Sequence, residues 1–405
     1  MKKIAVFGYG TVGSGVIEIV ERNAKVIEDR LGEAVEVKYV LDLKEFPGTS
    51  IEHKVVHNVD VIIEDPEVDV VVEVMGGVEP AFTFVSRALC AGKSAVTSNK
   101  ALVAAKGEEL LAMAKEHNVS FLFEASVGGG IPIIRPLNMA LCADEFEEIT
   151  GILNGTTNYI LTRMADEGLE FGKVLQDAQD NGFAERDPSA DIEGYDACRK
   201  IAILSSIAYG HSVNYEDIHT EGINGISAVD IAYARALKCK IKLLARSVSR
   251  DGKVYALVAP YLLSKKHPLY SIDGVINSVY VKGNMVGDLI FTGAGAGKLP
   301  TASAVVGDVI DALRNEGRTL PCNWKSGKLT LSDYTDIENA FFVRLRGNYA
   351  ERKAEIDTLF ADYEVIRLDD NDSEFAIVTS VMSEGKFEEL SKKLNNIITT
   401  LRVSK

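Results

Sequence analysis

Residues 3–15 read KIAVFGYGTVGSG, an apolar strand that runs straight into a glycine loop and the start of a helix. In this order Gly8 and Gly10 let the backbone turn tightly and approach a pyrophosphate, while Gly13 lets the helix pack close to the strand. The N-terminus of the helix favours the anion. The stretch therefore predicts a dinucleotide-binding unit rather than a glycine turn of purely structural purpose.

The next predicted strand, 35–41, ends at an acidic residue. Asp42 stands where a carboxylate can accept a hydrogen bond from a ribose hydroxyl, which is the feature expected after such a glycine loop. Lys44 follows closely, and a basic residue there can tolerate a 2'-phosphate. The sequence therefore leaves NAD and NADP both open.

The pattern of alternating strands and helices continues to about residue 123 and predicts a doubly wound parallel sheet. Lys100 follows Asn99 just beyond the carboxyl end of one strand, at the edge where such sheets bind ligands. An exposed lysine at a helix start explains it equally well, so both interpretations stay open. The predicted strands are 69–75, 94–97 and 119–123, and the helices are 16–27, 80–91 and 101–117.

Two glycine-rich loops interrupt this alternation. Residues 124–132, EASVGGGIP, leave backbone carbonyls and amides free to face a ligand or ion, and they suit a domain hinge. Residues 293–297, GAGAG, open a helix over 302–313 and can close over the cofactor from the other side. This helix is expected to return to the first domain, which makes that domain discontinuous.

Residues 187–200, DPSADIEGYDACRK, gather four carboxylates and a lysine near one expected helix start. We expect Asp191 to cap a single helix that places Glu193, Asp196 and Lys200 on one face. Charge spacing alone favours an exposed turn with an i,i+4 ion pair. The polar run 153–159, LNGTTNY, either caps a helix or offers hydroxyls and amides to a small polar substrate.

The remaining chain predicts two further folds. A hairpin across Asp251-Gly252 and strands near 275–281 and 288–292 predict a mostly antiparallel sheet. The tail reads βαββαβ, which is a ferredoxin-like order. The predicted domains are a Rossmann-type unit over 1–127 and about 296–320, an α+β catalytic and dimerisation domain over 128–295, a linker over 321–337, and a ferredoxin-like domain over 338–405.

Composition limits the classes of partner. The 405 residues are 46% hydrophobic and carry a formal net charge of -15, which argues against nucleic-acid and anionic-membrane partners. The start of the chain lacks a signal-peptide pattern and no stretch is long enough to span a bilayer, so we expect a cytoplasmic protein. The five cysteines are scattered, which predicts reduced thiols. His53 and His57 lack further ligands, so we expect no zinc.

Six motifs in one order resemble homoserine dehydrogenase over nearly the whole chain. The resemblance implies that a nicotinamide cofactor exchanges hydride with L-aspartate 4-semialdehyde to give L-homoserine, in threonine and methionine biosynthesis. It also implies a homodimer or higher oligomer. The motifs are GYGTVGSG, TSNKALVA, EASVGGGIPII, LNGTTNYIL, ERDPSADIEGYDACRK and GAGAGKLPTASAVVGD.

The resemblance also implies residue roles. Lys200 would donate the proton, and Lys100 would lie between nicotinamide and substrate. The loop from Glu124 looks like the family's loop for a monovalent cation such as sodium. The candidate residues are, for substrate, Glu185, Asp191, Asp196 and Thr156; for cofactor, Gly8, Gly10, Thr11, Val12, Gly13, Asp42, Lys100, Gly295 and Gly297; and for the cation, Glu124, Val127, Gly129 and Ile131.

The tail resembles an ACT regulatory domain, which would bind an amino-acid effector such as threonine. The loop after its first strand, 346–350, reads RGNYA and lacks the proline common there, so a purely structural role is weighed evenly. Two other functions compete with the main prediction. One is another small amino-acid or aldehyde dehydrogenase, which would need a nucleophilic cysteine. The other is a non-catalytic dinucleotide sensor, which would not need both lysines.

Overall fold

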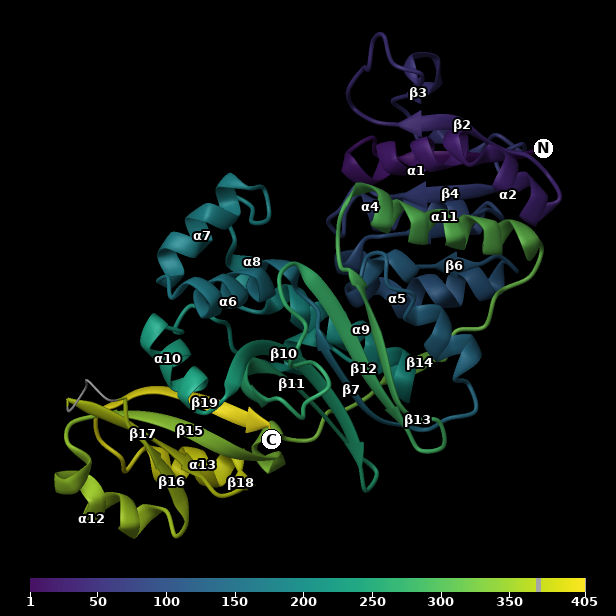
Figure 1. The fold of residues 1–405 in the computed structure, drawn as a ribbon. Coiled ribbons are helices and arrows are strands. Elements are labelled where there is room, and N and C mark those ends of the chain that lie inside the picture. The colour runs from purple at the N-terminus through teal and green to yellow at the C-terminus, as the bar shows by residue number, and fades with distance from the viewer. Residues whose placement is uncertain (369–372, 405) are drawn as a thin grey trace. The chain divides into compact units, whose positions relative to one another are not determined.

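The computed structural model describes residues 1–368 and 373–404. The chain forms two compact units whose segments alternate along the sequence (Figure 1). The N-terminal unit comprises 1–145, 202–215 and 291–329. The C-terminal unit comprises 146–201, 216–290 and the described part of 330–405. Within the described residues, none of the helices combines the length and hydropathy needed to cross a membrane.

The N-terminal unit is built on a parallel sheet with the strand order β3-β2-β1-β4-β5-β6. This is the order of a dinucleotide-binding Rossmann fold, so the predicted doubly wound sheet is confirmed. Each central strand is apolar and buried on both faces, as a parallel sheet requires. The strands are β1 (Lys2–Phe7), β2 (Val35–Leu41), β3 (Val55–Val56), β4 (Val70–Glu73), β5 (Ser94–Thr97) and β6 (Phe121–Leu122).

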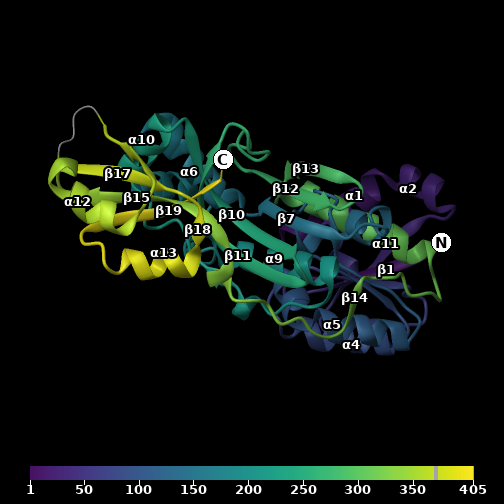
Figure 2. The same ribbon diagram turned by 90° about the horizontal axis from the view of Figure 1, so that it is seen from below.

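Helices cover both faces of this sheet. In Figure 2, α4 and α5 lie on one side and α1, α2 and α11 on the other. The late helix α11 packs on α1, and its Val305 and Val309 share a core with Ile4 and Val16. The helix expected over 16–27 is two helices, because Asn23 leaves helical geometry. The helices are α1 (Thr11–Arg22), α2 (Ala24–Leu31), α3 (Asp60–Ile63), α4 (Ala81–Cys90), α5 (Lys100–Glu116) and α11 (Lys298–Arg314).

The second sheet begins as the predicted antiparallel one, with the order β13-β12-β7-β10-β11. The hairpin between β10 and β11 turns at Asp251 and Gly252, both with positive φ (52° and 75°), as a tight hairpin of right-handed twist requires. The strands are β7 (Phe146–Ile152), β9 (His219–Thr220), β10 (Cys239–Arg250), β11 (Lys253–Ser264), β12 (Ile276–Gly283) and β13 (Gly287–Ala294), and three of the helices are α6 (Gly155–Glu167), α7 (Phe171–Asp180) and α10 (Ala228–Ala236).

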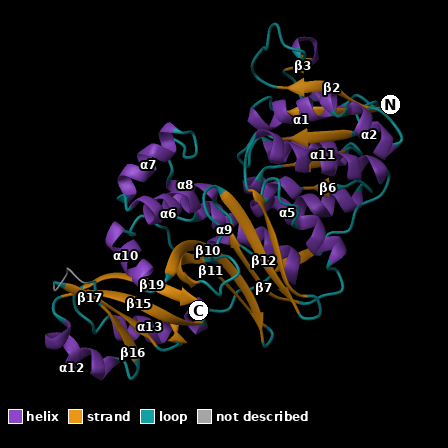
Figure 3. Cartoon of the chain, in the orientation of Figure 1, coloured by secondary structure: helices purple, strands orange, loops and turns teal. Residues whose placement is uncertain are grey.

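The tail has the predicted βαββαβ order and the strand order β19-β15-β17-β16 of a ferredoxin-like sheet (Figure 3). Its core of Phe341, Ile377 and their neighbours packs under α12 and α13. The elements are β15 (Glu338–Arg346), α12 (Tyr349–Leu359), β16 (Tyr363–Ile366), β17 (Glu374–Thr379), β18 (Met382–Ser383), α13 (Glu384–Ser391) and β19 (Ile397–Ser404).

One pairing lies beyond the reach of the sequence pattern. The edge strand β19 pairs in parallel with β11, with Leu262 opposite Val403, so the antiparallel and ferredoxin-like sheets form one sheet in the described part of the chain. The sequence predicts two separate sheets. An edge strand presents unpaired amides and carbonyls, and here another part of the same chain satisfies them.

The segment predicted as a linker, 321–337, is anchored to the N-terminal unit. Its strand β14 (Trp324–Lys328) pairs in parallel with β8 (Gly210–Ser212). Trp324 is buried, its indole donates to Ser212 Oγ (2.8 Å), and its ring lies against Gly107, where a Cβ would approach to 2.9 Å. All five cysteines are free thiols, as predicted.

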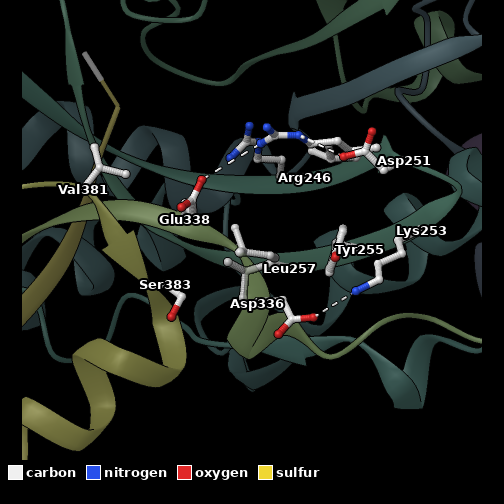
Figure 4. A pocket seen from close by; sticks show the side chains of 12 residues that line it. Arg246, Asp251, Lys253, Tyr255, Leu257, Asp336, Glu338, Val381 and Ser383 are labelled. Atoms are coloured by element: carbon white, nitrogen blue, oxygen red, sulfur yellow. Dashed lines mark ion pairs between the residues drawn. The ribbon is translucent and has the colours of Figure 1, made fainter.

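A surface groove of about 700 Å³ opens in the C-terminal unit along the β10–β11 hairpin and strands β15 and β18 (Figure 4). Its charges form loose pairs, Lys253 with Asp336 at 3.5 Å and Arg250 with Glu338 at 4.0 Å. These side chains are more than half exposed, so the pairs contribute little to stability.

We predict that Trp324→Ala destabilises the fold by about 3–5 kcal/mol, because it empties a close-packed site. Chemical denaturation followed by circular dichroism measures this change. Lys325→Ala on the same strand is the control, since its exposed side chain should shift the free energy of unfolding by only about 0.5 kcal/mol. Equal effects of the two substitutions would contradict the prediction.

Candidate active site

The glycine loop between β1 and α1 has the geometry that its sequence predicts. Gly8 adopts a φ of +98°, and a Cβ on Gly13 would lie 2.0 Å from the Gly8 carbonyl oxygen. Gly10 is the N-cap of α1 and offers no side chain to its first amides. Those amides, including the ones of Thr11 and Val12, are therefore left to a ligand.

Asp42 lies at the end of β2 and holds the glycine loop in place. One carboxylate oxygen accepts from the Tyr9 amide (2.9 Å) and the other from the Lys44 amide (3.0 Å). Its predicted bond to a ribose hydroxyl stays a prediction. The structure adds a role in ordering the loop that precedes the cofactor helix.

Glu73, at the end of β4, is a residue that the sequence reasoning missed. Its carboxylate is fully buried and accepts from Thr97 Oγ1 (2.5 Å) and from the amides of Met75 (2.8 Å) and Gly76 (3.3 Å). Burial raises the pKa of Glu73, although these donors oppose the rise. The available sequence signal was a carboxylate at the end of an apolar strand. Glu73 organises the edge of the sheet where ligands are expected to bind.

Lys100 begins α5 at the carboxyl end of β5. Asn99 caps this helix by accepting from the Leu102 amide (3.1 Å), and its Nδ2 donates to the Gly77 carbonyl (2.5 Å). Lys100 is half-buried. The structure thus places it at the sheet edge that the sequence predicted, and its role there stays a prediction.

The two glycine-rich loops lie against each other in the N-terminal unit. A Cβ on Gly129 would lie 2.5 Å from the Gly295 carbonyl oxygen, and the Gly130 amide donates to the Ala294 carbonyl (3.0 Å). Gly297, with a φ of +118°, is the N-cap of α11. Both loops therefore need glycine for close approach, and α11 brings a second helix N-terminus to the cofactor unit.

The predicted cation loop is anchored by the side chain of Glu124. Its buried carboxylate accepts from three successive amides, those of residues 133–135, at 2.6 to 2.8 Å. Val127 and Ile131 are buried as well. The Glu124 carboxylate is therefore engaged, which leaves backbone carbonyls as the oxygen donors of the loop. Among residues 1–368 and 373–404, no three His, Cys, Asp or Glu side chains could hold a metal ion.

The segment 187–200 departs from the expected single helix. It forms α8 (Ser189–Ile192) and α9 (Tyr195–Tyr209), separated at Gly194, whose φ is +87°. Asp191 therefore lies inside α8 and is not the N-cap. Glu193 lies outside α9 and does not share a helical face with Asp196. The prediction was wrong because a left-handed glycine interrupts the charge periodicity.

Asp196 and Lys200 form the predicted i,i+4 pair, but in a buried setting. Lys200 Nζ donates to Asp196 Oδ2 (2.7 Å) and to the Leu153 carbonyl (2.8 Å). The two side chains are 3% and 11% exposed. The interpretation as an exposed charged turn is therefore wrong, because both side chains of the pair are buried.

Asn154 connects the acidic residues and was not singled out from the sequence. Its Nδ2 donates to Asp191 Oδ1 (2.7 Å) and Asp196 Oδ2 (2.9 Å), while its Oδ1 caps α6 by accepting from Thr157 N (2.8 Å). The capping interpretation of the polar run 153–159 therefore holds for this residue, and the binding of a small polar substrate stays a prediction. Asn154 serves as a cap and it orients the carboxylates.

The other two substrate candidates lie in different settings. Thr156 is buried and donates to the Phe183 carbonyl (2.7 Å). Glu185 is exposed in the loop before α8, and its backbone carbonyl accepts from Gln179 (3.1 Å). Burial and the nearby Asp196 raise the pKa of Asp191, against hydrogen bonds from Asn154 and Thr156.

Two protein-family models match the chain and show which family it belongs to. The homoserine dehydrogenase NAD-binding domain matches residues 8–124, and the homoserine dehydrogenase domain matches residues 132–310. The chain belongs to the homoserine dehydrogenase family. It is an NAD(P)-dependent oxidoreductase that acts on a CH–OH group.

Individual relatives agree with this assignment. A homoserine dehydrogenase of Synechocystis is 47% identical over 76% of this chain and 72% of its own. The crystal structure of a homoserine dehydrogenase from Thiobacillus denitrificans has a TM-score of 0.91 and 34% identity, over 100% of this chain and 98% of that one. A hyperthermophilic archaeal homoserine dehydrogenase mutant in complex with NADPH has a TM-score of 0.66 and 32% identity, over 77% of this chain and 98% of that one.

We predict that Asp191→Asn gains stability relative to the unmodified protein as the pH rises from about 4 to 8. A raised pKa in the folded state stabilises the fold below the unfolded pKa, and this contribution is lost as the carboxyl ionises. Melting temperatures across this range measure the effect. The exposed Asp187, whose pKa is lowered by hydrogen bonds from Ser189, supplies the control Asp187→Asn, which should not show this trend. A difference that stays constant with pH would contradict the prediction.

Proposed function

We propose that Lys200 is the proton donor when L-aspartate 4-semialdehyde is reduced to L-homoserine. The nicotinamide supplies the hydride when it is bound. Negative charge then develops on the aldehyde oxygen, and a positioned ammonium can stabilise and protonate it. In the reverse direction the same nitrogen takes the proton from the hydroxyl of homoserine.

The contacts of Lys200 carry this proposal. An ammonium has three N–H groups, and two of them are directed to Asp196 and the Leu153 carbonyl. The third remains for a substrate oxygen. The Asp196 carboxylate orients the ammonium of the lysine, and Asn154 holds that carboxylate in position.

The acidic residues suit the ammonium of the amino-acid substrate. Asp191 and Asp196 are brought together by one amide. Burial and then repulsion from Asp196 raise the pKa of Asp191, and a cation placed beside the two carboxylates would relieve that repulsion. Glu185 lies in the loop that leads into α8 and would add a third carboxylate. We assign the substrate carboxylate to donors of either the Thr156 region or the Lys100 region.

We propose that Lys100 lies beside the nicotinamide, and its place at the carboxyl edge of the Rossmann sheet supports this role. The cofactor would be held by Gly8 to Gly13, Asp42 and the loop of Gly295 and Gly297. Asp42 favours NAD and the neighbouring Lys44 favours NADP. Rates with each cofactor, followed by the absorbance of the reduced nicotinamide, decide between them.

We further propose that the loop from Glu124 to Ile131 binds a monovalent cation such as sodium through backbone carbonyls. The engaged Glu124 carboxylate and the left-handed Gly129 support this donor set, since hard cations prefer oxygen ligands. A homo-oligomer, an amino-acid effector at the C-terminal domain and a cytoplasmic location stay predictions. A threonine titration of activity tests the effector.

We predict that Lys200→Ala lowers kcat by at least about 100-fold and leaves cofactor affinity nearly unchanged. Steady-state kinetics with homoserine and a cofactor titration by fluorescence measure the two effects. The matched control is Lys242→Ala, which removes another buried lysine that pairs with Asp273 (2.9 Å) outside this site. Unchanged turnover in Lys200→Ala, or an equal loss in Lys242→Ala, would overturn the assignment.

A further inference from the structure

Arg402, on the last strand of the ferredoxin-like domain, joins two carboxylates. Its buried guanidinium donates to both oxygens of Glu384, at 2.8 and 2.9 Å, and to both oxygens of Glu221, at 2.8 and 2.7 Å. Burial raises the pKa of Glu221, but hydrogen bonds from His219 and Arg402 outweigh it and hold the pKa at about 2. Two bidentate pairs on one guanidinium fix both carboxylates in direction as well as distance.

Glu221 directly follows the short strand β9, which pairs with β11. Its amide donates to the Val258 carbonyl at 2.7 Å, and the preceding His219 stacks on Tyr334 with ring centroids 4.0 Å apart. The backbone of Glu221 is thus bonded to strand β11 of the antiparallel sheet, and its side chain is bonded to Arg402 of the ferredoxin-like domain. Its position depends on both.

The residues around Glu221 lie in direct contact with the segment 187–200, called here the substrate segment because it carries the proposed substrate residues. The Ile223 amide donates to the Ile192 carbonyl (2.8 Å), and a Cβ on Gly222 would lie 2.2 Å from that same oxygen. On the other side, a Cβ on Gly194 would lie 3.2 Å from the Glu221 carbonyl oxygen. The two backbones therefore pack without intervening side chains, so that neither can shift alone.

The substrate segment in turn carries Asp191, Asp196 and Lys200. A displacement of residues 219–223 would therefore change the angle between α8 and α9 and the distance from Asp191 to Asp196. The contact between these backbones is rigid, since packed glycines have no rotamers that could absorb the shift.

We propose that Arg402 and Glu221 are positioning residues for catalysis, which transmit the placement of the C-terminal domain to the substrate segment. Their side chains bond to each other, to Glu384 and to His219. The inference rests on the proposed role of Lys200 and its neighbours. It extends that role by making the ferredoxin-like domain part of the support of the active site.

The test is Glu221→Gln, measured by amide hydrogen exchange and by steady-state kinetics on the full-length protein. A neutral amide keeps one acceptor for Arg402 but loses the charge and the second acceptor. We expect faster exchange at the amides of residues 194–200 and a kcat/KM for homoserine lower by roughly 10-fold to 100-fold. The KM of the cofactor should stay unchanged. Arg402→Lys is the second variant, since an ammonium cannot bind both carboxylates in bidentate fashion.

The control is Arg344→Lys, which breaks a comparable buried pair in the same domain. Arg344 donates to Glu374 (2.7 Å) and Asp230 (3.1 Å). Asp230 lies at the start of α10 and not in the substrate segment. The exchange of the control variant at 194–200 and its kcat/KM should match those of the unmodified protein. Unchanged exchange in Glu221→Gln and Arg402→Lys, or an equal change in Arg344→Lys, would overturn the proposal.

The exchange measurement separates this inference from the proposed function. It reports the mobility of residues 194–200 whether or not Lys200 donates the proton. Faster exchange with unchanged kinetics would show that the two segments are coupled without an effect on catalysis, and would overturn the positioning role. A loss of turnover in Lys200→Ala with unchanged exchange in Glu221→Gln would uphold the catalytic role and refute the coupling.

Discussion

A carboxylate can be buried only where donors surround it, and this constraint shapes each functional loop of the protein. Glu73 collects a hydroxyl and two amides at the edge of the Rossmann sheet. Glu124 accepts hydrogen bonds from three amides that follow the glycine-rich loop 124–132. Asp196 is held by Asn154 and Lys200. In each case the acid orders a segment that would otherwise be a polar loop.

Glycine supplies the second condition, which is close approach of one backbone to another. The pairs that approach closely are Gly13 with Gly8, Gly129 with Gly295, and Gly222 with Ile192. At each contact a methyl group would collide with a main-chain oxygen. The carboxylates fix where the loops start, and the glycines allow those loops to pack against their neighbours. The first glycine loop, the loop from Glu124 and the segment 187–200 are all built in this way.

The ferredoxin-like domain is integrated into the catalytic sheet. Its edge strand β19 continues the sheet through β11, and Arg402 on that strand reaches the loop behind the substrate segment. A regulatory domain on a flexible linker would show neither feature. The arrangement connects the domain through Arg402 and Glu221 to the backbone of residues 192–194.

Much of the local structure in both units was determined by the sequence itself. The order of strand, glycine loop and helix, the hairpin at Asp251-Gly252 and the βαββαβ tail depend on short-range patterns, because turn chemistry and hydrophobic period act over a few residues. The i,i+4 pair of Asp196 and Lys200 was also predictable, although its burial was not.

Only the tertiary structure decided the rest, because the deciding contacts join residues far apart in the chain. Gly194 breaks the expected helix to accommodate residues 220–221, Asn154 bridges acids that lie 37 and 42 positions away, and β19 pairs with β11. No local pattern encodes these contacts. The sequence thus determined the family and the chemistry that its residues can perform, and tertiary packing decided which of those residues share a site.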